Sequence, residues 1–403
     1  MRPSTIAAAL VIASLSLLSL GVLPILLGGL EQAGRITSAG IGQAAMLELF
    51  GLALGAAVGG YWMGRGNMRL KTAAAALGLA AVNIATAHAP EMTLVLMERA
   101  VAGLLAGLLF GAGNAIIVRS KDPDRLTGIL CGASVVPSIT LAYLLPVVVI
   151  PKFGIEAGFY ALSAGALVAL VFSVGLVDRV AKLEQPEHVP ARLSWRLAIF
   201  AGALLLQSGG LGAAWTYIER LANQHGFSPS VIGLAIAGSL ASQVAAAWLS
   251  AWVSPKVDKW QALLLLAVVQ TGFIVLAILT GAPASFIAAV CLFGGAAAAM
   301  QAFQVAGVIT LDTTRRTAVL VAPMILLGNG IGPLIASFFT AHGDVSGGAW
   351  TAVTMTSFAA FLYVAFALRS SRSLARPAYT GAHLPMSMPE GGSTDPLHIR
   401  GRH

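Results

Sequence analysis

Residues 5–29 read TIAAALVIASLSLLSLGVLPILLGG, an apolar run without a charged side chain. A helix that crosses the roughly 30 Å hydrocarbon core of a bilayer needs about 20 such residues, so the run predicts a transmembrane helix. It follows Met1, Arg2 and Pro3, as the apolar part of a signal peptide would. Because eleven similar runs follow, we interpret it as an uncleaved first span.

Runs of this kind occupy most of the chain. Their predicted limits are 5–29, 38–63, 70–88, 92–118, 127–150, 153–177, 196–217, 229–253, 261–281, 284–311, 317–341 and 347–368. Barrel strands would alternate in polarity, and these runs do not. We therefore predict an all-α membrane protein with twelve transmembrane helices.

The composition supports the same fold class. Of the 403 residues, 57% are hydrophobic and only 10% are charged, against roughly 25% charged in ordinary soluble domains. The mean hydropathy is +0.85. These values argue against a soluble enzyme, a disordered chain and a nucleic-acid-binding protein, and we expect the lipid bilayer to be the main partner. Cys131 and Cys291 lie in apolar runs and read as buried thiols rather than a disulfide.

The basic residues predict the orientation. With both termini in the cytoplasm, twenty Lys and Arg residues lie on the cytoplasmic side, three (Arg35, Lys152 and Arg220) lie on the opposite side, and Arg99 lies within a span. This is the bias that the positive-inside rule describes. It predicts a multi-pass protein of the inner (plasma) membrane.

The spans divide into two sets of six. Second-half spans begin 190–193 residues after their counterparts, as in 5 and 196, 38 and 229, 70 and 261, and 127 and 317. Internal repeats of this kind are typical of transporters. We expect an N-terminal six-helix bundle over 1–177, a cytoplasmic linker over 178–195, a C-terminal six-helix bundle over 196–369 and a disordered cytoplasmic tail over 370–403. Small-residue stripes in the second span (Gly51, Gly55, Gly59) and fourth span (Gly103, Gly107, Gly111) predict close helix packing.

The loop after the second span, residues 60–71, reads GYWMGRGNMRLK. It resembles the signature loop of the major facilitator superfamily, Gly-x-x-x-Asp-Arg-x-Gly-Arg/Lys-Arg/Lys. Gly60, Arg65 and Arg69 fit this pattern, and Gly64 stands where the family has Asp. We predict a cytoplasmic gate at these four residues, with Arg65 as the foremost candidate.

Two further elements resemble the drug-efflux branch of this family. They are the Arg-x-x-x-Gly element of the fourth span, at Arg99 and Gly103, and the sequence GNGIGP at 328–333 of the eleventh span. The resemblance implies two six-helix bundles around a central cavity, alternating access, and exchange of a drug-like compound for protons. It implies a role for Arg99 in proton coupling.

Ionisable residues inside the spans are the leading candidates for function, because a charge at mid-bilayer costs at least about 2.5–3.5 kcal/mol. Glu48 lies near the middle of the second span, Arg99 lies in the fourth, and Glu98 precedes it. We predict that Glu48 is the foremost proton-coupling residue, followed by Arg99 and Glu98. The alternative is a fixed structural ion pair, and the sequence does not decide whether Glu48 and Arg99 touch.

The family's cavity-lining helices are the first, fourth, seventh and tenth. On the last three of these, the candidate cavity residues are aromatic or amide-bearing: Phe110, Asn114, Gln207, Trp215, Phe293, Gln301 and Gln304. Such a lining suits an amphipathic organic molecule better than a phosphate ester, which needs several Arg or Lys residues. The alternative for each Gln is a hydrogen bond that joins neighbouring helices.

No Walker loop, metal-spaced His/Cys cluster or Ser–His pair is recognisable, so we expect no enzyme activity, cofactor or metal. The sequence predicts a monomeric secondary transporter that couples efflux of a small amphipathic organic compound to protons. One alternative is proton-coupled uptake of an organic acid or other metabolite. The other is a transport-inactive receptor or assembly partner with the same fold.

Overall fold

The structure is a computed structural model that describes residues 2–63, 66–178, 194–312, 321–340 and 344–374. The elements within these ranges are helices: α1 (Pro3–Ser16), α2 (Leu18–Gln32), α3 (Ser38–Trp62), α4 (Met68–His88), α5 (Met92–Ile117), α6 (Pro123–Leu144), the π-helical turn η1 (Leu145–Val149), α7 (Ile150–Phe153), α8 (Glu156–Ser173), α9 (Trp195–Gln224), α10 (Pro229–Val253), α11 (Lys259–Leu279), α12 (Pro283–Leu311), α13 (Val321–Ser337) and α14 (Ser346–Leu374).

The predicted membrane fold is confirmed. Eleven segments in the described ranges are long and apolar enough to cross a bilayer, and α13 is a shorter apolar helix. The first span is α1 and α2 joined at Leu17, and the fifth is α6, η1 and α7 in sequence. Most of the predicted linker and tail, with Gly64 and Arg65, lies outside the described residues.

The seventh span is longer than predicted. We expected it to end at 217, and α9 continues to Gln224. Its last two turns include Glu219 and Arg220, whose charges lower the local hydropathy, although α2 covers both side chains. The polar end of the helix is therefore paired with polar groups of α2.

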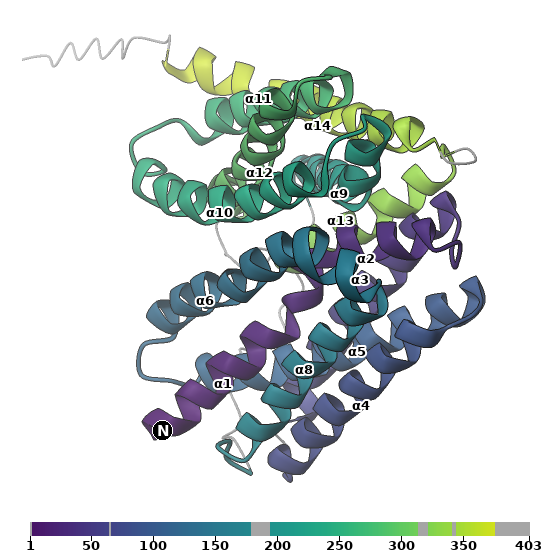
Figure 1. Cartoon of the computed structure of the whole chain (residues 1–403). Coiled ribbons are helices and arrows are strands. Elements are labelled where there is room, and N and C mark those ends of the chain that lie inside the picture. The colour runs from purple at the N-terminus through teal and green to yellow at the C-terminus, as the bar shows by residue number, and fades with distance from the viewer. Residues whose placement is uncertain (1, 64–65, 179–193, 313–320, 341–343, 375–403) are drawn as a thin grey trace, which may run out of the picture.

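The helices form two bundles (Figure 1). One comprises α1–α8, drawn purple to teal, and the other comprises α9–α14, drawn green to yellow. Three helix pairs make the most extensive contacts between the two bundles: α3 with α13, α6 with α10, and α2 with α9. These pairs surround the space between the two halves.

The internal repeat is visible in the helix bounds. Counterpart helices begin 191 residues apart at Ser38 and Pro229, at Met68 and Lys259, and at Met92 and Pro283. The packing repeats as well, because α3 packs on α5 and α10 packs on α12. The two bundles are therefore pseudo-symmetric, as the spacing of the apolar runs predicted.

The glycine stripes of the second and fourth spans, which are α3 and α5, bring these two helices into backbone contact. A Cβ placed at Gly107 would lie 2.7 Å from the amide nitrogen of Ala56 and 2.8 Å from Cα of Gly55. A Cβ at Gly103 would likewise overlap the backbone of Glu48. Close backbone approach replaces the hydrophobic driving force that helices lack in lipid.

This packing predicts the effect of adding one methyl group. Gly107→Ala should destabilise the folded protein by about 1–3 kcal/mol, because backbone atoms cannot move aside as a side chain can. Thermal unfolding in detergent should show a midpoint several degrees lower. Gly128→Ala on α6 is the matched control, since nothing lies within 4 Å of its added Cβ. Equal midpoints for the two variants would contradict the proposed packing.

Candidate functional site: the space between the bundles

The two bundles are joined at one end of the molecule. We call this the outer end; it is where α2 and α9 terminate, opposite the N-terminus. The hydroxyl of Tyr217 donates to the carbonyl of Ser38 at 3.2 Å, and an Arg220–Glu31 ion pair spans 2.8 Å. With both termini in the cytoplasm, as the basic residues predict, this end faces outward.

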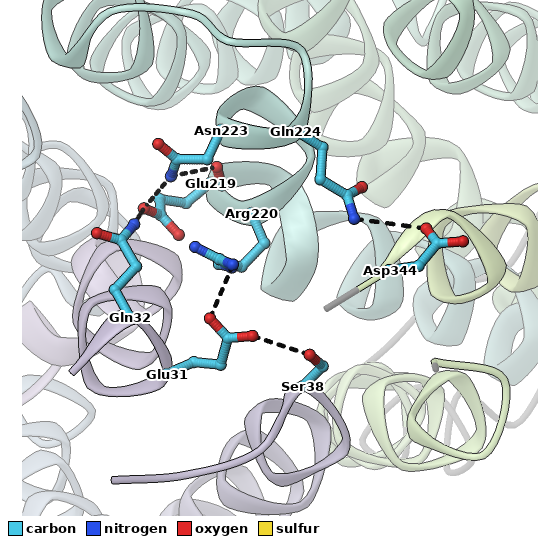
Figure 2. Close-up of polar contacts among 8 residues, drawn as sticks. All are labelled: Glu31, Gln32, Ser38, Glu219, Arg220, Asn223, Gln224 and Asp344. Carbon is cyan, nitrogen blue, oxygen red and sulfur yellow. Dashed lines mark hydrogen bonds and ion pairs between the residues drawn. The ribbon is translucent and has the colours of Figure 1, made fainter. Parts of the chain in front are cut away.

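Figure 2 shows the polar groups at the outer end, which we call the outer cluster: Glu31, Gln32, Ser38, Glu219, Arg220 and Asn223. The hydroxyl of Ser38 donates to Glu31 at 2.8 Å. Gln32 and Asn223 both donate to Oε1 of Glu219, at 3.0 and 2.5 Å. The cluster therefore connects α2 to α9 through the Arg220–Glu31 ion pair and the Gln32–Glu219 hydrogen bond.

Small residues let the bundles approach at this end. Gly42 of α3 lies against the backbone of Pro333 and against Ser337, both on α13. Its counterpart 191 residues on, Gly233 of α10, lies against Tyr143 and Pro146 of the fifth span. Equivalent contacts thus close the outer end on both sides of the space.

A central cavity of about 260 Å³ lies between the bundles. Its lining is apolar or polar without charge: Leu17, Leu20, Gly21, Leu23, Leu49, Ser134, Val135, Ser138, Leu211, Gly212, Trp215, Thr216, Leu240, Gln243, Leu326 and Asn329. Trp215, predicted as a cavity residue, is among them, and its indole donates to the carbonyl of Leu20 at 3.2 Å. Such a cavity can bind a small molecule through apolar contact and a few hydrogen bonds.

Phe110 and Asn114, also predicted, line a second cavity of about 190 Å³. It lies between α3 and α5 towards the end that holds the N-terminus, and Gly60 and Arg119 line it too. Phe110 and Asn114 therefore share a cavity, but it is separate from the central one.

Glu48 and Arg99 meet inside the first bundle. Oε2 of Glu48 lies 3.7 Å from a guanidinium nitrogen of Arg99, and both side chains are buried. The hydroxyl of Ser19 donates to Oε1 of Glu48, while Arg99 donates to Asn83 and Thr86 of α4, both at 2.8 Å. The pair that the sequence left undecided is thus formed, within a network from four spans.

An internal cavity of about 20 Å³ lies beside Glu48, Ser19 and Asn83. A space of this size admits about one water molecule. Glu98, the third candidate, is half-buried on α5, and its Oε2 has no hydrogen-bond partner. None of the three ionisable candidates lines the central cavity.

The remaining cavity candidates lie elsewhere. Gln207 is buried and donates to Gln270 of α11, which is the helix-joining role that the sequence left open. Phe293 and Gln304 are buried in the second bundle, and Gln301 is exposed. Their role in substrate binding stays a prediction.

The signature loop is described only in part. Arg69 donates to the carbonyl of Leu176 at 2.5 Å and lies 3.7 Å from Asp178, so it ties α4 to the end of the sixth span. Leu176 lies at the end of the first bundle and Asp178 at the start of the predicted linker, so neither partner lies in the second bundle. The gate predicted at Gly60, Gly64, Arg65 and Arg69 stays a prediction.

The outer cluster was missed in the sequence. The predicted seventh span ended before Glu219, and Arg220 was read as a loop residue. The sequence did contain an indication of this pair, because acidic Glu31 lies at the end of the first span of one half and basic Arg220 lies near the end of the first span of the other. Ser134, Ser138 and Thr216 carried no signal, because single hydroxyl residues are common in membrane helices.

Residues 6–322 match the sequence profile of the Major Facilitator Superfamily. None of the curated protein sequences compared with the chain matches it. The fold is similar to several solved structures. With the nucleoside transporter NupG the TM-score is 0.70 at 13% identity, covering 91% of this chain and 99% of that one.

Two further solved structures have the same fold. A bacterial homologue of the human lysosomal transporter Spinster gives a TM-score of 0.73 at 15% identity, covering 92% of this chain and 98% of that one. The xylose transporter XylE from E. coli gives 0.65 at 14% identity, covering 90% and 98%. The drug-efflux branch predicted from the motifs is not among these three.

The Glu48–Arg99 network predicts a strong non-additive effect on stability. Glu48→Met or Arg99→Met alone leaves a buried charge without its partner and should cost about 3–5 kcal/mol. The double variant removes both charges and should recover most of this loss. Thermal unfolding of the four proteins measures the coupling. Losses that simply add would show that the two side chains do not interact.

Proposed function

The chain belongs to the Major Facilitator Superfamily, and we propose that it is a proton-coupled secondary transporter that exports a small amphipathic organic compound. The observation that carries this proposal is the central cavity between the two bundles, whose lining is apolar and uncharged. Export by alternating access is the finer part of the proposal, and it also rests on the resemblance of Arg99, Gly103 and residues 328–333 to the drug-efflux branch.

The lining defines the chemistry of the substrate. Leu17, Leu20 and Leu240 offer apolar surface, whereas Gln243 and Asn329 offer amide donors and acceptors. A charged substrate would lose its hydration here without gaining an opposite charge, which is costly. The volume of about 260 Å³ lies near the small end of ligand sites, which span roughly 300–1,000 Å³. We therefore favour a small compound with an apolar body and one or two polar groups.

The position of Arg99 supports this substrate over an organic acid. Its guanidinium is fully buried and bound by Glu48, Asn83 and Thr86. Uptake of an organic acid would require Arg99 to leave these partners and reach the central cavity. An uncharged cavity serves a neutral substrate without this rearrangement.

The internal repeat supports a functional role for Glu48. At the equivalent positions, Gly103 packs on Glu48 and Gly294 packs on Ser239. The helices touch at these positions in both bundles, through the backbone of Glu48 in the first and the hydroxyl of Ser239 in the second, so the second bundle packs here without a carboxylate. Because a buried ion pair is seldom the most stable way to fill a core, we propose that Glu48 is kept for proton coupling.

Reconstituted proteoliposomes test the function directly. A panel of lipophilic cations, neutral drugs and organic acids is supplied under an imposed pH gradient. We expect a neutral amphipathic compound to move against its gradient, driven by protons. Glu48→Gln should abolish the proton-driven accumulation while exchange of substrate for substrate continues. Ser239→Ala, the matched change in the second bundle, should keep the coupling.

Two results of this assay would count against the proposal. Normal coupling in Glu48→Gln would assign the carboxylate a structural role. Movement of organic acids alone would overturn the substrate class in favour of uptake. A protein that moves no compound in the panel would instead support the transport-inactive receptor.

The cavity lining makes a separate prediction about affinity. Gln243→Ala removes an amide group from the cavity, and the KM for the transported compound should rise about two- to twelve-fold, since a hydrogen bond is worth roughly 0.5–1.5 kcal/mol. Thr354→Ala is the control, because Thr354 is exposed on α14 and bonds only its own helix. An unchanged KM in Gln243→Ala would exclude this side chain from substrate binding.

A further inference from the structure

One buried carboxyl group has no part in the mechanism above. Glu219 of α9 is only 6% exposed and lies in the contact between the two bundles. Both of its hydrogen-bond donors, from Gln32 of α2 and Asn223 of α9, reach the same oxygen, Oε1. The other oxygen, Oε2, is buried and has no hydrogen-bond partner.

The space for this carboxyl group depends on a glycine. A Cβ added at Gly28 of α2 would overlap Oε2 of Glu219, so the carboxyl group packs directly on the α2 backbone. The two residues are 191 apart, the spacing of the internal repeat. Two residues at equivalent positions touch only beside the two-fold axis that relates the halves, so Glu219 lies near the axis, in the contact between the two bundles.

The surrounding charges do not neutralise Glu219. Arg220 is its neighbour in sequence and acts on it, but the ion pair of Arg220 is formed with Glu31, itself an added negative charge. Of the helices that pack on α9, α12, α13 and the first half of α14 contain no charged residue, and the charges of α3 and α11 are Glu48 and Lys259. The other titratable groups near this end of α9 are Tyr217, which bonds Ser38, His225, which stacks on Phe227, and Asp344, which accepts from Gln224.

This geometry fits a neutral carboxyl group better than an ionised one. A carboxylate offers about four acceptor sites on its two oxygens, and leaving a buried charged oxygen unpaired is costly. When a proton sits on Oε2, Oε1 becomes a carbonyl oxygen that accepts from Gln32 and Asn223 as observed. When α2 and α9 separate, water reaches both oxygens and the group can ionise.

We infer that Glu219 is a second proton-binding site, distinct from Glu48, and that the outer end closes when its carboxyl group takes up a proton. Thr216, one helical turn below Glu219, lines the central cavity. The proton site therefore lies one helical turn from the cavity proposed for the substrate. The link to transport rests on the proposed function, whereas the link between protonation and closure does not.

A distance measurement tests the inference without any substrate. Ala33→Cys and Ser228→Cys place spin labels on exposed outer residues of the two bundles, with native Cys131 and Cys291 replaced by Ser. Double electron–electron resonance is then recorded in nanodiscs from mildly acidic to mildly alkaline buffer. We expect short distances in acid and a growing population of long distances as the pH rises.

Glu219→Gln replaces the carboxyl group by a neutral group of the same shape. It should keep the short distances at every pH. Asp344→Asn is the matched control on the same face; the amide and hydroxyl of Ser346 lower the pKa of Asp344, so this exposed carboxylate stays ionised throughout and its loss should change nothing. A pH-dependent shift in Glu219→Gln equal to that of the parent protein would overturn the inference.

A second variant keeps the inference testable if Glu219→Gln does not fold. Gln32→Ala removes the donor that reaches Glu219 from the other bundle and is therefore present only when the outer end is closed, so closure should need more acid and the midpoint of the transition should move to lower pH. No movement of the midpoint would contradict the inference.

If the distances respond to pH as expected and no compound is transported, the proposed function fails and the proton site stands. If proton-driven flux occurs and Glu219→Gln leaves the distances pH-dependent, the proposed function stands and the proton site at Glu219 fails.

Discussion

The contact between the two bundles at the outer end is the interaction on which the other features depend. Each bundle has an apolar core of its own, and a further buried apolar cluster continues from one bundle into the other, with Leu27 and Ile218 among its members. Small residues such as Gly28 and Gly42 allow the approach, and the outer cluster supplies its polar bonds. The central cavity exists because the bundles meet here without filling the space below. Rigid-body motion of one bundle against the other about this contact is the movement that alternating access requires.

The repeat separates what the fold needs from what function adds. Gly42 and Gly233, or Gly103 and Gly294, keep the same role in both halves, because close packing in lipid demands small residues at the same places. The chemistry differs between the halves. The first bundle buries Glu48 and Arg99, where the second has Ser239 and Val290. The polar network is therefore an addition to a scaffold that forms without it.

Much of this architecture could be predicted from the sequence, because hydrocarbon admits few structures. Twelve apolar runs, their basic loops and the offset of the halves follow from length and hydropathy alone. The glycine stripes likewise predicted close packing of α3 and of α5, although not that these two helices pack on each other. The residues of the candidate site were harder to predict from the sequence. Helical spacing tells which residues share a face of α9 or α12, but not which neighbour covers that face, so Gln207 and Trp215 received the same prediction and face different partners.

The predicted end of the seventh span was wrong for a related reason. Hydropathy treats Glu219 and Arg220 as the boundary of a span, since it scores each side chain as if lipid or water surrounded it. Here a second helix surrounds them, and α2 supplies Glu31 and Gln32 as partners. Polar groups that pair across the pseudo-symmetry axis cannot be recognised until both halves are in place. Sites at the bundle contact are thus the hardest to predict from one sequence.

The two buried carboxyl groups differ in what a proton must do to reach them. Glu48 has a cation, Arg99, and a hydroxyl donor, so a proton that binds there displaces an ion pair inside one bundle. Glu219 is held by amide donors, while the neighbouring Arg220 pairs with Glu31, and the environment of Glu219 changes when the bundles separate. A site of the first kind responds to rearrangement within a bundle, such as substrate binding against α2 and α3. A site of the second kind responds to the distance between bundles. A transporter that must move only when both substrate and proton are in place needs one of each.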